Sequence, residues 1–97
     1  MRRLFLRPAA KADLREIAHY SRQEWGAARA KIYLASLTNS LSRLKDLPDL
    51  GVECADLRAG YRRYGVGSHA IFYRLAPDRI EVVRILHQRM DAGRHLR

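Results

Sequence analysis

The chain reads His69-Ala-Ile-Phe-Tyr-Arg-Leu75, then Ala76-Pro-Asp-Arg79, then Ile80-Glu-Val-Val-Arg-Ile-Leu-His87. These residues are rich in β-branched and aromatic side chains and predict two strands, with a proline that presets a turn dihedral between them. Just upstream, residues 57–64 predict another strand, and the glycines of Gly65-Val-Gly-Ser68 suit a tight turn. Connections this short force neighbouring strands to run antiparallel, so the pattern predicts three consecutive antiparallel strands.

The residues before this region predict a short strand and two helices. Residues 3–7 form an extended segment, Pro8 suits a first helical turn, and Gly26 is placed to end the helix predicted over residues 8–25. A second helix runs from Ala27 until Pro48 forbids its continuation, and residues 48–56 have no period and predict a loop. The first helix is expected to bury Ala10, Leu14, Ile17, Ala18, Ser21 and Trp25 and to turn Asp13, Glu16 and Gln23 away. The second places Ala30, Leu34, Leu37, Leu41 and Leu44 on one stripe.

The order of these elements predicts an α+β fold, β-α-α-β-β-β, in which a helical hairpin packs on one face of an antiparallel sheet. A chain of 97 residues with 47% hydrophobic residues can form one core, so we expect a single domain over residues 1–97.

Charge is unevenly distributed along this basic chain. The net charge is +9, and residues 57–97 hold nine arginines and three acids, whereas all three lysines come earlier. Alternation of apolar and arginine residues predicts a half-buried sheet whose other face is a cationic surface. Arginine binds phosphate and carboxylate groups in a bidentate manner, so the expected partner is anionic, either nucleic acid or an acidic protein. A well-solvated basic face without a partner is the alternative.

The cysteine count and the hydropathy of the chain indicate its cellular compartment. Cys54 is the single cysteine, which excludes an internal disulfide and suits a reducing compartment. No apolar run is long enough for a membrane helix or a signal peptide, so we expect a cytoplasmic protein with no membrane contact.

Several motifs carry a resemblance to a known family. They are Pro8 with Ala12-Asp-Leu14 and Ile17, Tyr20, Trp25-Gly26, Pro48, Leu57-Arg58, Gly60-Tyr-Arg-Arg63, Gly67-Ser-His69, Ile71-Phe-Tyr-Arg74, Val83-Arg-Ile-Leu-His-Gln-Arg-Met-Asp91 and Arg94-His-Leu96. In these motifs, which span nearly the whole chain, the sequence resembles the ParE branch of the RelE/ParE toxins of bacterial type II toxin-antitoxin systems.

The resemblance implies a toxin that inhibits DNA gyrase by trapping it with cut DNA, with an indirect DNA contact possible in that complex. It also implies neutralisation by a ParD-like antitoxin, and it implies no cofactor. The RelE branch instead cleaves mRNA on the ribosome, and a RelE-like endonuclease is the alternative function. This chain departs from the RelE pattern because its sheet region has no lysine and no tyrosine follows Tyr73. A basic nucleic-acid-binding module without toxicity is a third reading.

Two sets of residues are predicted to bind partners. Ile32 lies off the core stripe of the second helix between two alanines, so it is a candidate partner patch. An antitoxin that wraps across the toxin, as the resemblance implies, would contact Ala28, Ile32, Ala35, Arg62, Arg74 and Arg84. The C-terminal segment has charged and apolar residues beyond the last strand with no evident core role, and the predicted target-binding residues are Arg84, Arg89, Met90, Arg94 and Leu96.

Catalytic and metal sites are not predicted. Arg62, Arg63, Arg74, Arg84 and His87 could converge on a phosphate with histidine as base. In a regular strand, however, Arg84 and His87 point to opposite faces. His87, Asp91 and His95 have helical spacing for metal ligands, but the segment begins in a strand and Gly93 interrupts it. Of the aromatic residues, Trp25 and Phe72 are expected in the core, while Tyr61 and Tyr73 remain open for surface stacking.

Overall fold

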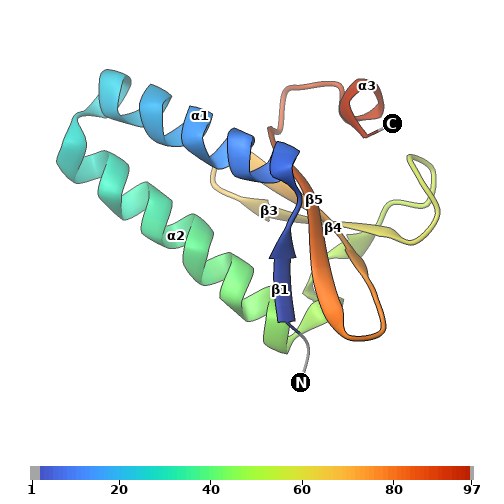
Figure 1. Ribbon diagram of the computed structural model, residues 1–97. Coiled ribbons are helices and arrows are strands. Elements are labelled where there is room, and N and C mark those ends of the chain that lie inside the picture. Colours follow the sequence, from blue (N-terminus) through green and yellow to red (C-terminus); the bar gives the residue numbers. More distant parts are fainter. Residues whose placement is uncertain (1–2, 97) are drawn as a thin grey trace.

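The computed structural model describes residues 3–96 as two layers, a helical hairpin and a five-stranded sheet (Figure 1). The elements are β1 (Arg3–Leu6), α1 (Pro8–Trp25), α2 (Ala27–Asp46), a 3-10 turn (Pro48–Leu50), β2 (Val52–Glu53), β3 (Tyr61–Val66), β4 (His69–Leu75), β5 (Arg79–His87) and α3 (Ala92–His95). The α+β class and the order of the strands and helices predicted from periodicity are confirmed, with β2 and α3 as additions.

The strand order is β1-β5-β4-β3-β2. Strands β3, β4 and β5 are antiparallel neighbours, as their short turns require. The first strand differs from the prediction because β1 lies beside β5 and runs parallel to it, with Leu6 opposite Val82. The helical hairpin carries the chain back across the sheet, so β1 can lie beside a strand that is distant in sequence. The sheet is therefore mixed rather than antiparallel.

The main core lies between the helical hairpin and the sheet. Its buried members are Ala10, Ile17, Leu37, Leu41, Leu44, Val66, Ile71, Tyr73, Ile80, Val82 and Ile85. The helical stripes predicted from 3.6-residue periodicity supply most of the helix side of this core. Trp25 is an exception, because it lies at the last position of α1 and is 39% exposed.

The opposite face of the sheet has a second apolar cluster, formed by Cys54, Tyr61, Ala70, Phe72, Val83, Leu86 and Leu96. The prediction of a wholly cationic second face is therefore wrong. A β-bulge contributes to this cluster, since the pairing register shifts between Phe72 and Tyr73 and leaves Val83 as the extra residue of β5. The C-terminal segment packs over the cluster, and the Arg58 guanidinium donates to the Leu96 carbonyl at 3.4 Å.

The predicted boundaries of β3 differ from those observed. The amides of Leu57 and Arg58 both donate to the Cys54 carbonyl, so this part of the chain turns, and β3 begins only at Tyr61. Gly60 has a φ of +84°, which suits this turn before the strand. The strand then continues to Val66, which shortens the hairpin connection to Gly67 and Ser68.

Tyr73 ties the sheet to the segment after α2. Its hydroxyl donates to the Pro48 carbonyl at 2.6 Å and accepts from the Gly51 amide at 2.8 Å. A side chain at Gly51 would place its Cβ 2.4 Å from the same hydroxyl, so only glycine fits here. Surface stacking is therefore excluded for Tyr73, which is fully buried, and for Tyr61, which is 5% exposed.

Candidate functional site: an apolar groove at the hairpin end

Apolar side chains are exposed where the hairpin end of α1 and α2 meets the β3–β4 turn. Ile32 is 72% exposed, Tyr20 58%, Met90 50% and Trp25 39%. One hollow of about 390 Å³ is lined by Trp25, Arg29, Ile32, Tyr33, Ser36 and Gly67. A second of similar size is lined by Glu16, Ile17, Tyr20, His69, His87, Arg89 and Met90. A third hollow shares Tyr20, Trp25, Gly67, His69 and His87 with these two and joins them, and we call the whole the hairpin groove.

Tyr33 organises the floor of the hairpin groove. Its ring packs edge-on against Trp25 with a centroid distance of 5.4 Å, and its hydroxyl is hydrogen-bonded to Nδ1 of His69 at 2.6 Å. The Ser68 amide also donates to this hydroxyl, at 3.1 Å. Gly67 has a φ of +56°, and a Cβ there would lie 2.7 Å from the Tyr33 ring. The β3–β4 turn therefore approaches α2 closely because its residue there is glycine.

Two histidines, His69 and His87, line the groove next to each other. The rings of His69 and His87 are 5.3 Å apart at a steep angle. Burial lowers the pKa of His69 below its ordinary value, and the neighbouring His87 lowers it further, while Asp13 opposes the shift. Neutral His69 therefore predominates at pH 7.

The antitoxin-binding residues predicted on α2 are accessible. Ile32 lines the groove, and Ala28 and Ala35 are exposed on the same helix. The three arginines predicted with them do not line this groove. Arg62 donates to the Gly51 carbonyl at 3.0 Å and lies 3.4 Å from Glu53, whereas Arg74 is exposed on the second face of the sheet.

Arg84 is held by an ion pair that periodicity did not indicate. Its Nε and Nη2 donate to the two carboxylate oxygens of Asp13 at 2.8 and 2.9 Å. The same carboxylate accepts the backbone amide of Ile85 at 2.9 Å, beyond the point where β1 stops pairing with β5. The expectation that Asp13 turns away from the sheet is therefore wrong. Hydrogen bonding to Asp13 raises the pKa of Arg84, although burial opposes the shift.

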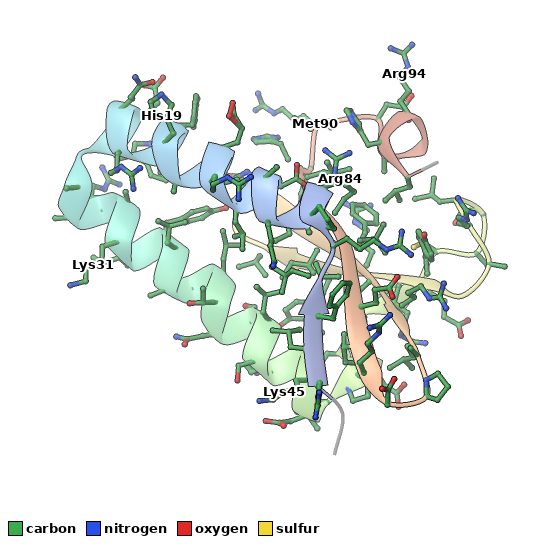
Figure 2. All side chains as sticks on the ribbon, viewed as in Figure 1. His19, Lys31, Lys45, Arg84, Met90 and Arg94 are labelled. Atoms are coloured by element: carbon green, nitrogen blue, oxygen red, sulfur yellow. The ribbon has the colours of Figure 1, made fainter. Side chains whose placement is uncertain are left out.

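The C-terminal residues predicted to bind the target are divided between surface and core. Arg89 and Met90 are exposed, and Arg94 projects from α3 with its side chain 80% exposed (Figure 2). Leu96 is 4% exposed in the second apolar cluster. The premise that Leu96 has no core role is therefore wrong, and deletion of the segment that contains it would uncover buried apolar surface.

The structure also separates the residues considered for catalysis. His87 lies in the hairpin groove beside α1, whereas Arg84 donates to Asp13 and to the His95 carbonyl. Within residues 3–96, no three side chains of His, Cys, Asp or Glu lie close enough together to hold a metal ion. Nor does any helix in that part of the chain have the length and apolar character needed to span a membrane.

Sequence reasoning missed several groove residues. Tyr20 stands out in the sequence only as a family-like position, Trp25 is predicted to lie in the core, and Tyr33 is not among the predicted site residues. The one sequence signal for the groove is that its aromatic residues cluster on either side of Gly26, at the connection between the two amphipathic helices. No sequence signal pairs Asp13 with Arg84, because 71 residues separate them.

Comparisons with known proteins agree on one family. The model of the ParE toxin of the type II toxin-antitoxin system parDE matches residues 4–92. A Mycobacterium tuberculosis protein named Toxin ParE1 is 43% identical over 95 residues, which cover 97% of each chain. A Caulobacter vibrioides protein of the same name is 45% identical over 87 residues, 90% of each chain.

Solved structures of toxin-antitoxin systems have the same fold. A chain from the chromosomal ParDE system of P. aeruginosa superposes with a TM-score of 0.79 at 19% identity, covering 90% of this chain and 96% of that one. A chain of the M. tuberculosis toxin-antitoxin complex RelBE2 gives 0.68 at 18% identity, covering 90% and 98%. The extent of the family match and the identity to both ParE1 proteins assign the sequence: the chain belongs to the ParE toxin family of type II toxin-antitoxin systems.

Proposed function

We propose that this ParE-family protein inhibits DNA gyrase and is neutralised by a ParD-like antitoxin. Family membership supports the general role, and the structural similarity to a chain of the P. aeruginosa ParDE system supports a ParD-like partner. The gyrase target follows from the ParE resemblance. The observation that carries most weight is the exposed hairpin groove, since exposed large apolar side chains that gather in one groove are typical of an interaction site.

The antitoxin segment is proposed to be an acidic, amphipathic helix that folds on binding. Its apolar side would fill the groove, and its acidic side would face a protein of charge +9. Ile32 and Trp25 are large exposed anchors at one end of the groove, and Tyr20 and Met90 lie at the other. Apolar anchors separated along a groove suit a helix that presents residues at i, i+4 and i+7.

We expect Ile32→Glu to weaken binding of a co-encoded antitoxin by about tenfold to a hundredfold, because it places a charge on an apolar anchor. Calorimetric titration measures the affinity. The fold should be unaffected, since the side chain is 72% exposed. Leu47→Glu is the matched control, because Leu47 is 54% exposed just after α2 and does not line the groove. Equal affinity of the Ile32 variant and the wild type would exclude this end of the groove from the interface.

The proposed gyrase contact is the exposed part of the C-terminal segment, Arg89, Met90 and Arg94. These side chains combine charge with an apolar group and are free of core packing. Met90 also lines the hairpin groove, so an antitoxin in the groove would cover part of the gyrase contact. Neutralisation would follow from this overlap. Arg84 and Leu96 remain predictions for this contact, but each has a structural role of its own.

We expect purified wild-type protein to raise the yield of gyrase-cleaved DNA, and the combined change Arg89→Gln, Met90→Ser and Arg94→Gln to abolish that increase. The reason is that removal of several anchors of one interface commonly removes most of its binding energy. Agarose-gel quantification of linear plasmid measures the effect. A variant with Arg15→Gln and Arg43→Gln loses the same charge from exposed helix positions and should remain active.

The same preparation distinguishes the gyrase poison from a RelE-like endonuclease. Ribosome-bound mRNA should stay intact, because Arg84 and His87 do not face one phosphate position. Cleaved transcripts without any gyrase effect would contradict the proposal and favour the nuclease. Inactivity in both assays would contradict it as well and favour a basic binding module.

A further inference from the structure

A cleft of about 390 Å³ is bordered by three arginines on the second face of the sheet. Its lining residues are Arg7, Arg58, Ala59, Gly60, Tyr61, Arg74 and Leu75. None of these residues lines the hairpin groove, so the cleft is a separate surface. Three guanidinium groups around one hollow repel each other, and an anion would stabilise this arrangement.

A buried acid that pairs with Arg7 neutralises only part of this charge. Glu81 is 7% exposed, and it accepts from Arg7 Nε at 2.6 Å and from Arg79 Nη2 at 3.2 Å. Arg7 and Arg79 thus use one carboxylate oxygen each. Burial alone would raise the pKa of Glu81, but the hydrogen bond and charge of Arg7 and the charges of Arg74 and Arg79 lower it. Glu81 is therefore ionised at neutral pH, and the three arginines around this one carboxylate, together with Arg58 in the cleft lining, leave an excess positive charge.

Arg58 and Arg74 carry that excess, since neither contacts a carboxylate among residues 3–96. Arg58 is already oriented, because its guanidinium lies 5.8 Å from the Tyr61 ring centroid and donates to the Leu96 carbonyl. Arg74 is exposed on β4 directly across from Tyr61 on β3. The two guanidinium groups therefore border the cleft with donors free for a ligand, and a partly fixed arginine loses less entropy on binding.

The neighbouring groove indicates which kind of anion fits. On the other side of the segment 54–61 lies a hollow of about 610 Å³ lined by Glu53, Asp56 and Asp91 together with Arg63. Glu53 and Asp91 of this hollow pair with Arg62 and Arg94, and its apolar lining comes from Val52, Leu57 and Met90. A nucleic-acid backbone that left the cleft in this direction would bring phosphates against carboxylates. A polypeptide can instead alternate acidic, apolar and basic side chains, so the pair of hollows favours a protein ligand.

We propose that the cleft between Arg58 and Arg74 binds the carboxylate of an acidic side chain from a protein partner. The inference rests on the proposed antitoxin for the source of that side chain, and it adds a second contact distant from the apolar anchors of the hairpin groove. A bidentate, charge-assisted pair in this cleft would set the register of the acidic segment across the sheet.

Binding of a blocked hexaglutamate peptide to the full-length protein tests the cleft without an antitoxin or gyrase. Arg74→Gln should weaken this binding by about tenfold, the loss expected for one charge-assisted hydrogen-bonded contact. Arg15→Gln removes the same charge from an exposed helix position and should change affinity by less than about twofold. In NMR spectra, the Nε–H signals of Arg58 and Arg74 should shift on peptide addition while that of Arg15 does not.

Three outcomes would overturn the inference. The wild type could fail to bind the peptide, or Arg74→Gln and Arg15→Gln could weaken peptide binding equally. Arg74→Gln could also abolish binding of a short DNA duplex while leaving peptide binding unaffected. The last result would make the cleft a phosphate site. The peptide measurement is independent of the gyrase assay, so failure of the cleft leaves the proposed toxin function intact, and failure of gyrase inhibition leaves the cleft intact.

Discussion

Asp13→Ala is expected to lower the free energy of unfolding by about 3–5 kcal/mol, the cost of breaking a largely buried ion pair by removing one partner. The change leaves the Arg84 guanidinium without its bidentate acceptor and the Ile85 amide without a partner at an unpaired strand edge. A domain of this size has a total stability of about 5–15 kcal/mol, so the variant would approach the unfolding threshold. Urea denaturation followed by circular dichroism measures the loss.

Matched variants separate the charge from the hydrogen bonds at this position. Asp13→Asn keeps one acceptor oxygen for the Ile85 amide and should lose less stability than Asp13→Ala. Glu24→Ala removes an exposed acid from the same helix and should change stability by less than about 0.5 kcal/mol. Because Arg84 is one of the two partners, Asp13→Ala and Arg84→Ala should be strongly non-additive in a double-mutant cycle. A loss below about 1 kcal/mol for Asp13→Ala would show that the pair is not structural.

Tyr73→Phe is expected to cost about 2–4 kcal/mol, although it removes a single oxygen atom. That hydroxyl satisfies both the Pro48 carbonyl and the Gly51 amide, and the phenylalanine ring would leave both backbone groups without this partner. The segment from α2 to β2 would loosen with the loss of these bonds. Tyr64→Phe is the control, because Tyr64 packs at the edge of the same core and its hydroxyl has no hydrogen-bond partner within residues 3–96.

Tyr73→Phe should change local hydrogen exchange as well as global stability. Amide hydrogen exchange of Gly51 should accelerate in the Tyr73 variant more than exchange of residues in β4 and β5, since its acceptor is lost directly. If the two tyrosine variants unfold at the same urea concentration, the hydroxyl of Tyr73 contributes nothing beyond its ring.

Predictions from sequence succeeded where local periodicity carries the information. The apolar spacing from Ala10 to Ile17 and from Leu37 to Leu44 identified the buried faces of α1 and α2, because a helix exposes or buries a side chain according to its angle around the axis. Short turns made β3, β4 and β5 antiparallel neighbours for an equally local reason. The predicted boundaries failed at β3, where backbone hydrogen bonds to Cys54 turn the chain before the strand starts.

The candidate site was only partly predictable. Ile32 was identified because it departs from the stripe of its own helix, which is a local observation. Its neighbours in the groove come from the end of α1, the β3–β4 turn and the segment after β5, and their proximity depends on how the hairpin lies on the sheet. The exposure of Trp25 likewise depends on α1 extending beyond the sheet, and the burial of Leu96 on how the C-terminal segment returns.

The amino-acid sequence by itself determined the order of the main helices and strands and the basic character of residues 57–97, since propensity, periodicity and composition act between near neighbours. Its motifs also identified the ParE family. Only the tertiary structure decided that β1 pairs with β5, that Asp13 holds Arg84, and that Arg58 and Arg74 border one cleft. Those contacts join residues far apart in the chain, and their energies depend on distance and burial, which arise only when the layers pack.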